Sequence, residues 1–433
     1  MHIGFIGLGK LGLPCAIATA EKGHSVVGYD VNPAINSSRH PRELLYTQET
    51  DETGKGTIQL MLNATTLRIV DSLEEVISHA ELIFIAVQTP HQAQYEGHVP
   101  IPDTREDFNY EHLISCVKAL SDTLDRMNQK RIITIISTVL PGTLRKYVFP
   151  VLSKNVSLCY NPYFIAMGSV VYDFYNPEFI LLGHIDDEAE QLVRQFYATI
   201  TSAEVFSTTL ENAEMIKVSY NTFITTKIVM ANNIMEMCHH LPNTNVDVVM
   251  AGLKKGTRRL VSTSYLNGGM GDGGGCHPRD NIAMSWLSNR LGLEYNYYDF
   301  IMKKREKQTE FLADLIIQEL QKNKLTTKKN KSICILGTAF KPNTNIETGS
   351  PAVLLKNLLL AKGYEVATFD PYLNPHLDPS QKWYCEEDYI YFIGCRHDCI
   401  QEYEFNDSCI VIDPHRYIKK EKCKNLIQVG LGL

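Results

Sequence analysis

The sequence predicts an α/β protein in which two doubly wound parallel sheets are separated by a helical segment. Short apolar runs alternate with longer amphipathic segments over residues 2–160. Helical patterns without a strand signal fill residues 203–320, and a second alternation starts at residue 332. These three observations predict an α/β domain over 1–202, a helical domain over 203–325 and a second α/β domain over 326–433.

Six strands are expected in the first domain, each a short apolar run, with helices between them. They cover residues 2–7, 25–30, 67–70, 82–87, 132–137 and 156–159. The polar, Pro-rich segment 86–107 follows the fourth strand. It is therefore a loop at the carboxyl edge of the sheet, where open α/β folds bind their ligands.

A glycine pattern, Gly7-x-Gly9-x-x-Gly12, stands between the first strand and an alanine-rich helix. The first glycine permits a tight turn, the second lets the backbone approach a pyrophosphate, and the third lets helix and strand pack closely. Asp30 ends the second strand, where a carboxylate accepts the ribose hydroxyls of NAD. No arginine directly follows Asp30, although Arg39 lies further on, so the pattern favours NAD over NADP.

Glu214, Lys217 and Asn221 recur at helical spacing in the first long helix of the middle domain, so all three share one face. A solvent-facing polar stripe is one interpretation. The flanking positions are apolar almost all round, however, and a polar stripe on a buried helix lines a site because buried charges need partners.

The segment 268–280 places one thiol, Cys276, at the end of a glycine-rich run. Glycine lets the backbone fold closely against a ligand, and a thiolate is a strong nucleophile, so the pattern indicates covalent catalysis. A flexible surface loop with an incidental cysteine is the alternative.

The Lys-rich segment 322–331 is expected to link the helical domain to the last domain. There, strands are expected at 332–340, 364–371, 389–395 and 408–414, with a helix over 351–363. A second doubly wound domain therefore ends the chain.

Composition narrows the function class. The 433 residues carry a net charge of −7, which argues against nucleic acid as a partner. No apolar run is long enough to span a membrane, and no leader pattern precedes the first strand, so a cytoplasmic protein is expected. The 11 cysteines are scattered, which favours free thiols, and Cys395-Arg-His-Asp-Cys399 lacks a second ligand pair, so no metal is expected.

These motifs, in this order, resemble the UDP-glucose/GDP-mannose dehydrogenase family, especially its UDP-glucose 6-dehydrogenases. The resemblance runs from end to end and rests on the turn with Asp30, VQTP (87–90), STVLPGT (137–143), ENAEMIKVSYNTF (211–223), YLNGGMGDGGGCHPRD (265–280) and ILGTAFKPNT (335–344). It implies two Rossmann-like domains, for NAD and for a UDP-sugar, bridged by a central helical domain with a long helix that forms a homodimer.

The resemblance also implies roles for particular residues. The catalytic set would be Cys276 as nucleophile, Lys217 and Asn221 for the oxyanion, Asp280 to hold Lys217 or a water, and Thr138 to position water. NAD would be bound by Gly7, Leu8, Gly9, Lys10, Leu11, Gly12, Asp30, Thr89, Pro90, Ser137 and Thr138. The sugar nucleotide would contact Tyr163, Phe164, Ile165, Lys217, Asn221, Arg259 (or its neighbour Arg258), Tyr265, Leu266, Asn267, Gly268, Gly273, Phe340 and Lys341.

The chain departs from the family pattern at its NPEFLxEG segment, which reads NPYFIAMG (161–168) here. Tyr163 and Met167 replace the two glutamates that support thioester hydrolysis, and neither is a carboxylate base near neutral pH. Glu178, in a nearby NPEF, belongs to the following strand and is not expected in that role. Thr348 replaces an arginine near the cofactor, while His277 and Arg279 alter the nucleophile loop more mildly.

Three hypotheses follow. The first is NAD-dependent oxidation of the C6 hydroxymethyl of UDP-glucose or a related UDP-hexose to the uronic acid, through a thiohemiacetal and thioester on Cys276. The second is a two-electron oxidation that stops at the aldehyde or occurs at another hydroxyl. The third is a catalytically quiet relative that binds nucleotide sugars.

Overall fold

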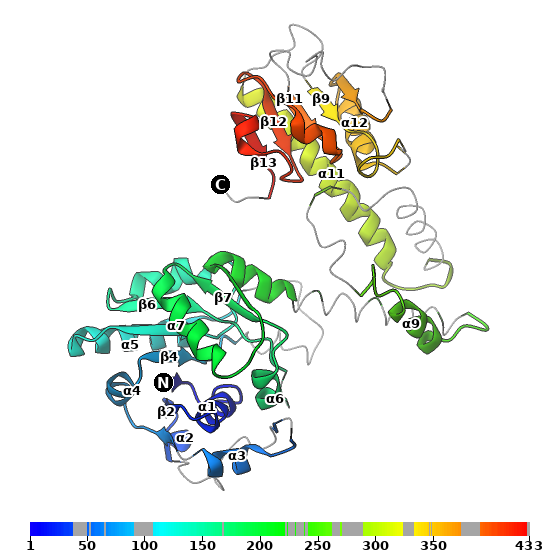
Figure 1. The fold of residues 1–433 in the computed structure, drawn as a ribbon. Coiled ribbons are helices and arrows are strands. Elements are labelled where there is room, and N and C mark those ends of the chain that lie inside the picture. Colours follow the sequence, from blue (N-terminus) through cyan, green and yellow to red (C-terminus); the bar gives the residue numbers. More distant parts are fainter. Residues whose placement is uncertain are drawn as a thin grey trace. The chain divides into compact units, whose positions relative to one another are not determined.

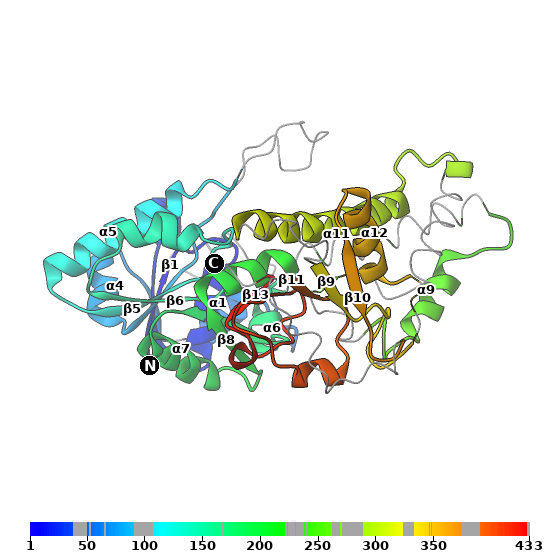
Figure 2. The ribbon, with the colours of Figure 1, turned by 90° about the horizontal axis from the view of Figure 1, so that it is seen from above.

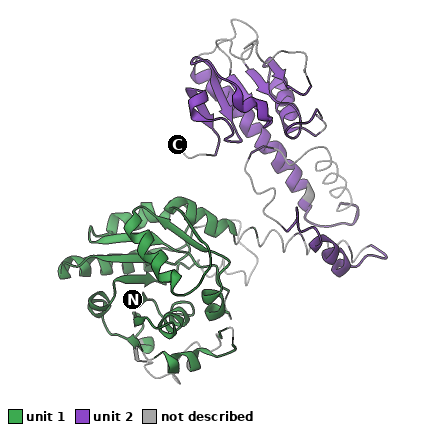
Figure 3. Cartoon of the chain, in the orientation of Figure 1, with its two compact units in different colours: residues 1–226 green, residues 227–433 purple. Residues whose placement is uncertain are grey.

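The computed structural model describes residues 1–37, 50–51, 53–64, 66–90, 107–166, 169–220, 223, 230, 238, 241–261, 269–270, 289–323, 333–345, 347, 349–373 and 390–430. The chain forms two compact units, Met1–Thr226 and Lys227–Leu433, each described by itself (Figure 3). The three-domain division at 202 and 325 stays a prediction.

The first unit, coloured blue to green in Figure 1, is built on an eight-stranded sheet. The strand order is β3-β2-β1-β4-β5-β6-β7-β8. Its strands are β1 His2–Ile6, β2 Ser25–Tyr29, β3 Leu67–Ile69, β4 Leu82–Ile85, β5 Arg131–Ile135, β6 Val156–Tyr160, β7 Ile180–His184 and β8 Val205–Thr209. All neighbours pair in parallel except β6 and β7. The strand order reverses between β1 and β4, where doubly wound sheets bind nucleotides.

The six strands expected in the first domain are confirmed as β1 to β6. The strand β8 lies where the sequence indicated helices only, so that part of the prediction was wrong. β8 is an edge strand and none of its five residues is buried, which leaves it without the apolar run that marks a strand in a sequence.

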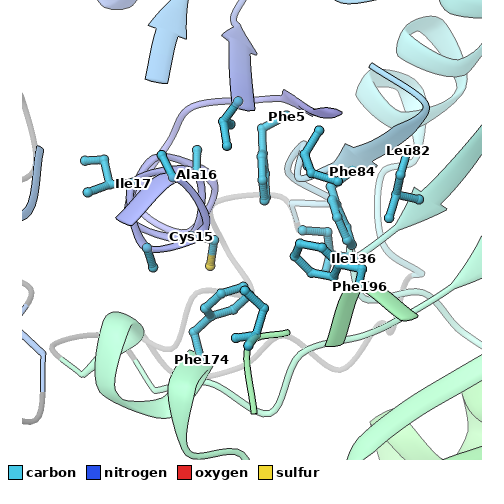
Figure 4. Close-up of a cluster of buried hydrophobic side chains, with 14 of the residues drawn as sticks. Phe5, Cys15, Ala16, Ile17, Leu82, Phe84, Ile136, Phe174 and Phe196 are labelled. Carbon is cyan, nitrogen blue, oxygen red and sulfur yellow. The ribbon is translucent and has the colours of Figure 1, made fainter. Parts of the chain in front are cut away.

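Helices cover both faces of this sheet (Figure 2), and two separate apolar cores lie beneath them. The helices are α1 Gly12–Glu21, α2 Pro33–Ser37, α3 Thr57–Asn63, α4 Leu73–His79, α5 Glu111–Met127, α6 Val170–Tyr175 and α7 Asp187–Ala198. Helices α1, α6 and α7 pack on one face, and α4 and α5 pack on the other. In the first core the Phe5 and Phe84 rings stack at 5.1 Å between centroids, and Phe196 lies 5.1 Å from Phe84 (Figure 4).

Residues 141–152 and 210–220 continue this unit. A π-helical turn, Leu144–Val148, and a 3-10 turn, Phe149–Val151, lead from β5 to β6. Residues 210–220 are helical and follow β8 directly. Leu210 and Ala213 of that helix pack into the core beneath α4 and α5, so the helix that carries Lys217 belongs to the first unit.

The second unit contains a five-stranded parallel sheet in the order β10-β9-β11-β12-β13. Its strands are β9 Ile333–Leu336, β10 Val366–Phe369, β11 Ile390–Ile393, β12 Ile410–Asp413 and β13 Asn425–Gln428. The first four confirm the four expected strands, and β13 adds a short, partly exposed edge strand that the sequence analysis missed.

Helices of the second unit are α9 Val246–Lys254, α11 Tyr297–Lys322 and α12 Pro351–Ala361, with 3-10 turns at Asp398–Glu402 and Lys420–Lys422. The 26-residue helix α11 is the expected long helix, and its last turns pack with α12 on one face of the sheet through Leu312, Ile316 and Leu320. Ser350 caps α12 by accepting the N–H groups of Ala352 and Val353. No helix within the described ranges is long and apolar enough to cross a membrane.

Candidate functional site

The three glycines of the first turn have the geometry that the pattern predicts. Gly7 has φ +91°, and a Cβ there would lie 2.9 Å from the backbone of Ala86. A Cβ on Gly12 would lie 1.9 Å from the carbonyl oxygen of Gly7, so only glycine lets α1 start this close to β1. Nothing lies within 4 Å of a Cβ built on Gly9, which leaves space for a ligand beside the backbone.

Asp30 stands beside this turn. Its Oδ2 accepts the N–H of Leu8 at 2.7 Å and its Oδ1 accepts the N–H of Asn32 at 2.8 Å, so the carboxylate is held at the end of β2. Helix α1 has no side-chain cap and no acidic residue in its first turn, which leaves its positive end open to an anion. A pyrophosphate on the turn and a ribose on Asp30 fit these residues.

Of the other turn residues, Lys10 is exposed and Leu11 is half-buried. Leu8 is completely buried in the apolar core, where a Cβ on Gly28 would touch it at 2.9 Å. Leu8 can therefore contribute to a nucleotide site only through its backbone.

The loops after β4 and β5 complete this edge of the sheet. The hydroxyl of Thr89 donates to the carbonyl of Thr138 at 2.7 Å, and that of Ser137 donates to the carbonyl of Val87 at 2.6 Å. The carbonyl of Pro90 accepts the N–H of Asn109 at 2.8 Å. Because β2, β1, β4 and β5 are neighbours in the sheet, the described residues expected to bind NAD lie at the carboxyl ends of adjacent strands.

Lys217 is buried, with 7% of its surface exposed, and its ammonium donates to the backbone carbonyl of Tyr163 at 2.8 Å. The ammonium also lies 5.0 Å from the centroid of the Phe164 ring. Burial lowers the pKa of Lys217 below its ordinary value. The polar stripe on this helix is thus not a solvated face.

Glu214, one turn earlier, has a structural role. Its carboxylate accepts the N–H groups of Gly142 at 2.5 Å and Leu144 at 2.9 Å, and the residue is completely buried. Burial raises the pKa of Glu214. The carboxylate caps the turn after β5 and fastens it to the Lys217 helix.

Tyr163 presents its carbonyl to Lys217 while its side chain packs into the interior. The hydroxyl of Tyr163 is buried beside Tyr197, and the ring lies 6.0 Å from Phe174 between centroids. Burial holds the pKa of the Tyr163 hydroxyl well above its usual value. Tyr163 therefore cannot replace a carboxylate base, and among its functional groups only the backbone faces Lys217.

An aromatic cluster joins the Tyr163 segment to the Lys217 helix. The Phe164 ring lies 4.5 Å from Tyr220 and 4.7 Å from Phe179 between centroids. The Tyr220 hydroxyl donates to the carboxylate of Glu178 at 2.9 Å. Glu178 lies before β7 and not within a strand, so that part of the prediction was wrong, and it reaches the helix of Lys217.

In the second unit, Phe340 and Lys341 follow β9, and the Lys341 ammonium lies 5.4 Å from the Phe340 ring centroid. The turn before them repeats the geometry of the first unit. Gly337 has φ +84°, and Asp370 at the end of β10 accepts the N–H groups of Thr338 at 2.7 Å and Ala339 at 2.8 Å.

Asp370 differs from Asp30 because its carboxylate contacts a buried histidine. His397 Nε2 lies 3.0 Å from its Oδ2, and His397 Nδ1 accepts the N–H of Asn343 at 2.9 Å. Burial alone would raise the pKa of Asp370, but hydrogen bonds from His397 and from backbone N–H groups lower it. This network fixes the loop that carries Lys341. His397 is the histidine of the Cys395–Cys399 motif, and both of its ring nitrogens are engaged in these contacts. Sequence analysis missed this network, although Asp370 ends its strand as Asp30 does.

Several predicted residues lie outside the described residues: Cys276, Asn221, Asp280, Tyr265, Leu266, Asn267, Gly268, Gly273, Met167 and Thr348. Ile165 is half-buried and packs at the edge of the first core. Arg259 follows α9 and is exposed. In the ranges given above, no group of His, Cys, Asp and Glu side chains could hold a metal ion, and the nine cysteines there are free thiols.

The comparisons with known proteins agree with this geometry. Residues 1–201 match the NAD binding domain of the UDP-glucose/GDP-mannose dehydrogenase family, and residues 211–306 match its central domain. A UDP-glucose 6-dehydrogenase of Rickettsia conorii is 28% identical over 86% of this chain and 81% of its own length. One from Bacillus subtilis is 26% identical over 87% of this chain and 81% of its own length.

Among solved structures, GDP-mannose dehydrogenase from Pseudomonas aeruginosa has the same fold, with a TM-score of 0.84 and 20% identity over 98% of this chain and 99% of that one. A UDP-glucose dehydrogenase from Pyrobaculum islandicum aligns with a TM-score of 0.52 and 24% identity over 100% and 98% of the two chains. The two family matches span most of the chain and include the glycine turn, Asp30 and the Lys217 helix. The chain therefore belongs to the UDP-glucose/GDP-mannose dehydrogenase family and is an NAD-dependent nucleotide-sugar dehydrogenase.

Proposed function

We propose that this protein oxidises the C6 hydroxymethyl group of a UDP-hexose to the uronic acid, with UDP-glucose as the first candidate substrate. Relatives over most of its length are named UDP-glucose 6-dehydrogenases. The observation that carries the proposal is the buried ammonium of Lys217, which donates to a neutral carbonyl. A buried cation with such a partner favours negative charge that develops on a substrate oxygen.

The residues of the first turn fit NAD, which when bound supplies the hydride acceptor for the oxidation. The turn 7–12 would hold the pyrophosphate at the open end of α1, and Asp30 would accept the ribose hydroxyls. Thr89, Pro90, Ser137 and Thr138 would border the rest of the cofactor, because their loops follow adjacent strands.

The chemical steps on the sugar would use side chains of this chain. The Cys276 thiolate would attack the C6 aldehyde, and Lys217 and Asn221 would stabilise the oxyanion of the resulting thiohemiacetal. Oxidation of that adduct leaves a thioester on Cys276. Thr138 would position the water that cleaves it, while Asp280 would hold Lys217 or that water.

One observation favours a second candidate function, a two-electron oxidation that stops at the aldehyde or occurs at another hydroxyl. The Tyr163 hydroxyl is buried and its pKa is raised, so this position offers no base for hydrolysis. Met167 in the same segment cannot titrate. A relative that binds nucleotide sugars without catalysis is the third candidate.

The residues proposed to contact the UDP-sugar are Tyr163, Phe164, Ile165, Lys217 and Asn221 in the first unit, and Arg259, residues 265–268, Gly273, Phe340 and Lys341 in the second. A homodimer through the helical middle segment is part of the proposal. Helix α9 supports it, since no residue of α9 is buried and its apolar side chains Val248, Val249 and Leu253 are exposed. A cytoplasmic location stays a prediction of the sequence.

Counting the NADH formed per UDP-glucose under single-turnover conditions tests the proposal. Two NADH per sugar support oxidation to the acid, and one supports the second candidate. None, with retained binding of UDP-glucose by calorimetry, supports the third. Two NADH together with a mass increase on Cys276 would show that the thioester forms and that its hydrolysis alone is lost.

Cys276→Ala is the companion experiment. The variant should form at most one NADH per sugar, because the thiohemiacetal cannot form without the thiol. Two NADH from this variant would overturn the covalent route. A thermal-shift panel of UDP- and GDP-sugars would identify the substrate, since a ligand that binds only the folded state raises the melting temperature.

A further inference from the structure

The start of the glycine-rich segment is attached to the long helix of the second unit. The amide of Gln308, on α11, donates to the carbonyl of Gly269 at 2.7 Å. The neighbouring residue, Met270, packs against the core beneath α11 and α12. Gly269 and Met270 therefore have a polar and an apolar attachment to a rigid element.

A second attachment comes from the carboxyl edge of the second sheet. His415 follows β12, and the buried carboxylate of Asp413 accepts the backbone N–H of His415 at 2.9 Å and that of Ile418 at 2.7 Å. The ring Nε2 of His415 is buried. The backbone of His415 is thus held by the sheet while its ring lies in the interior.

The His415 ring lies directly against Gly269. A Cβ added to Gly269 would lie 2.7 Å from Nδ1 and 3.1 Å from Cε1 of that ring. Gly269 does not have a left-handed φ, so the backbone itself would accept another residue. The absence of a side chain at position 269 is required by the ring of His415.

We propose that Gln308 and His415 are positioning residues for the nucleophile: they hold Gly269 and Met270 on the second unit and so determine where the loop that carries Cys276 begins. The anchor lies on the same unit as the Lys341 loop, which follows β9. The segment with Cys276 would then start from the same unit that carries Lys341. This role rests on the proposed function.

The test uses the close contact between Gly269 and the ring of His415, which leaves no room for a methyl group. Gly269→Ala should lower kcat by roughly 10-fold to 100-fold, because misplacing a reacting group by about 1 Å costs up to about 100-fold. The KM for NAD should not change, since the glycine turn and Asp30 belong to the other unit. The rate at which iodoacetamide alkylates Cys276, followed by peptide mass spectrometry, should change in parallel without any substrate.

His415→Ala removes the ring that a methyl group on residue 269 would meet. In the His415→Ala background, adding Gly269→Ala should therefore have at least about 10-fold less effect on kcat and on alkylation than it has alone. Equal effects in both backgrounds would overturn the anchor. Alkylation of Cys276 needs no sugar nucleotide. It therefore tests the positioning role even if the proposed activity is wrong.

Gln308→Met keeps the volume of the side chain and removes the amide that donates to the Gly269 carbonyl. This variant tests the proposal if Gly269→Ala does not fold. It should change the Cys276 alkylation rate and lower kcat without changing the KM for NAD. Gln318→Met, an exposed glutamine on the same helix, is the matched control and should change neither. Identical kinetics of the two variants would refute a positioning role for Gln308.

Discussion

The charge of Lys217 is the clearest residue-scale signal of function. Its ammonium is buried, its pKa is lowered by burial, and its partner among the described residues is a neutral carbonyl. A buried charge without a counter-ion costs free energy in the folded state. Folding alone does not account for that cost, whereas stabilising an oxyanion does.

Lys217→Met should separate stability from activity. Methionine keeps the apolar contacts and removes the buried charge, so the melting temperature should stay equal or rise. The kcat should fall by at least about 100-fold, because removing one oxyanion donor costs about 100-fold to 1,000-fold. Thermal unfolding and initial rates measure both.

Lys118→Met is the control, since Lys118 pairs with Asp122 on the surface and should affect neither quantity measurably. Retained activity in Lys217→Met would remove Lys217 from the catalytic set.

His415 predicts a pH dependence of stability. Burial lowers its pKa from the ordinary 6.5 to about 4 in the folded protein. Between these two values the unfolded chain binds more protons, so the free energy of unfolding falls as the pH decreases from 6.5 to 4 and then levels off for this group. The loss amounts to roughly 3 kcal/mol at most.

Urea unfolding at pH 7 and pH 4.5 measures that dependence. His415→Asn should lose less stability between the two pH values than the wild type, because asparagine does not titrate. Equal losses would show that His415 does not carry the effect.

At the scale of elements, the turn between β1 and α1 combines two kinds of glycine. Gly12 is required by packing, because a Cβ there would lie 1.9 Å from the Gly7 carbonyl. Gly9 faces open space, so a Cβ there would disturb only a ligand. The two positions can therefore be tested against each other.

Gly12→Ala should lower both the melting temperature and the affinity for NAD, because α1 must shift away from β1. Gly9→Ala should leave the melting temperature unchanged and still weaken NAD binding by at least about 10-fold, since its methyl group occupies the approach to the pyrophosphate. Calorimetric titration with NAD and thermal unfolding distinguish the two. Unchanged NAD affinity in Gly9→Ala would contradict this location of the cofactor.

The strands differ in how well their sequences predicted them. The apolar runs of β1, β4, β9, β11 and β12 are buried almost throughout in parallel pairings, so their patterns were readable. The edge strands β8 and β13 are partly exposed and were missed. The polar face of the Lys217 helix was predicted, but only packing shows that Glu214 caps a turn while Lys217 faces the Tyr163 carbonyl.

At the scale of the whole molecule, each unit has its own apolar cores, two beneath the first sheet and two beneath the second. NAD contacts are expected in the first unit only. We therefore expect NAD at about 100 times its Kd to stabilise the first unit by about 2.7 kcal/mol and the second unit little. Hydrogen exchange measured with NAD alone would show protection confined to residues 1–226, and equal protection of both units would contradict a cofactor site in the first.

The sequence by itself determined the fold class, the NAD turn with Asp30, and the family, because glycine spacing and apolar periodicity are local consequences of backbone geometry. Only the tertiary structure decided that Tyr163 turns its hydroxyl inward, that Glu178 accepts a hydrogen bond from Tyr220, and that His397 contacts the carboxylate of Asp370. These contacts join residues far apart in the chain, and side-chain direction and burial depend on packing between elements that no local pattern encodes.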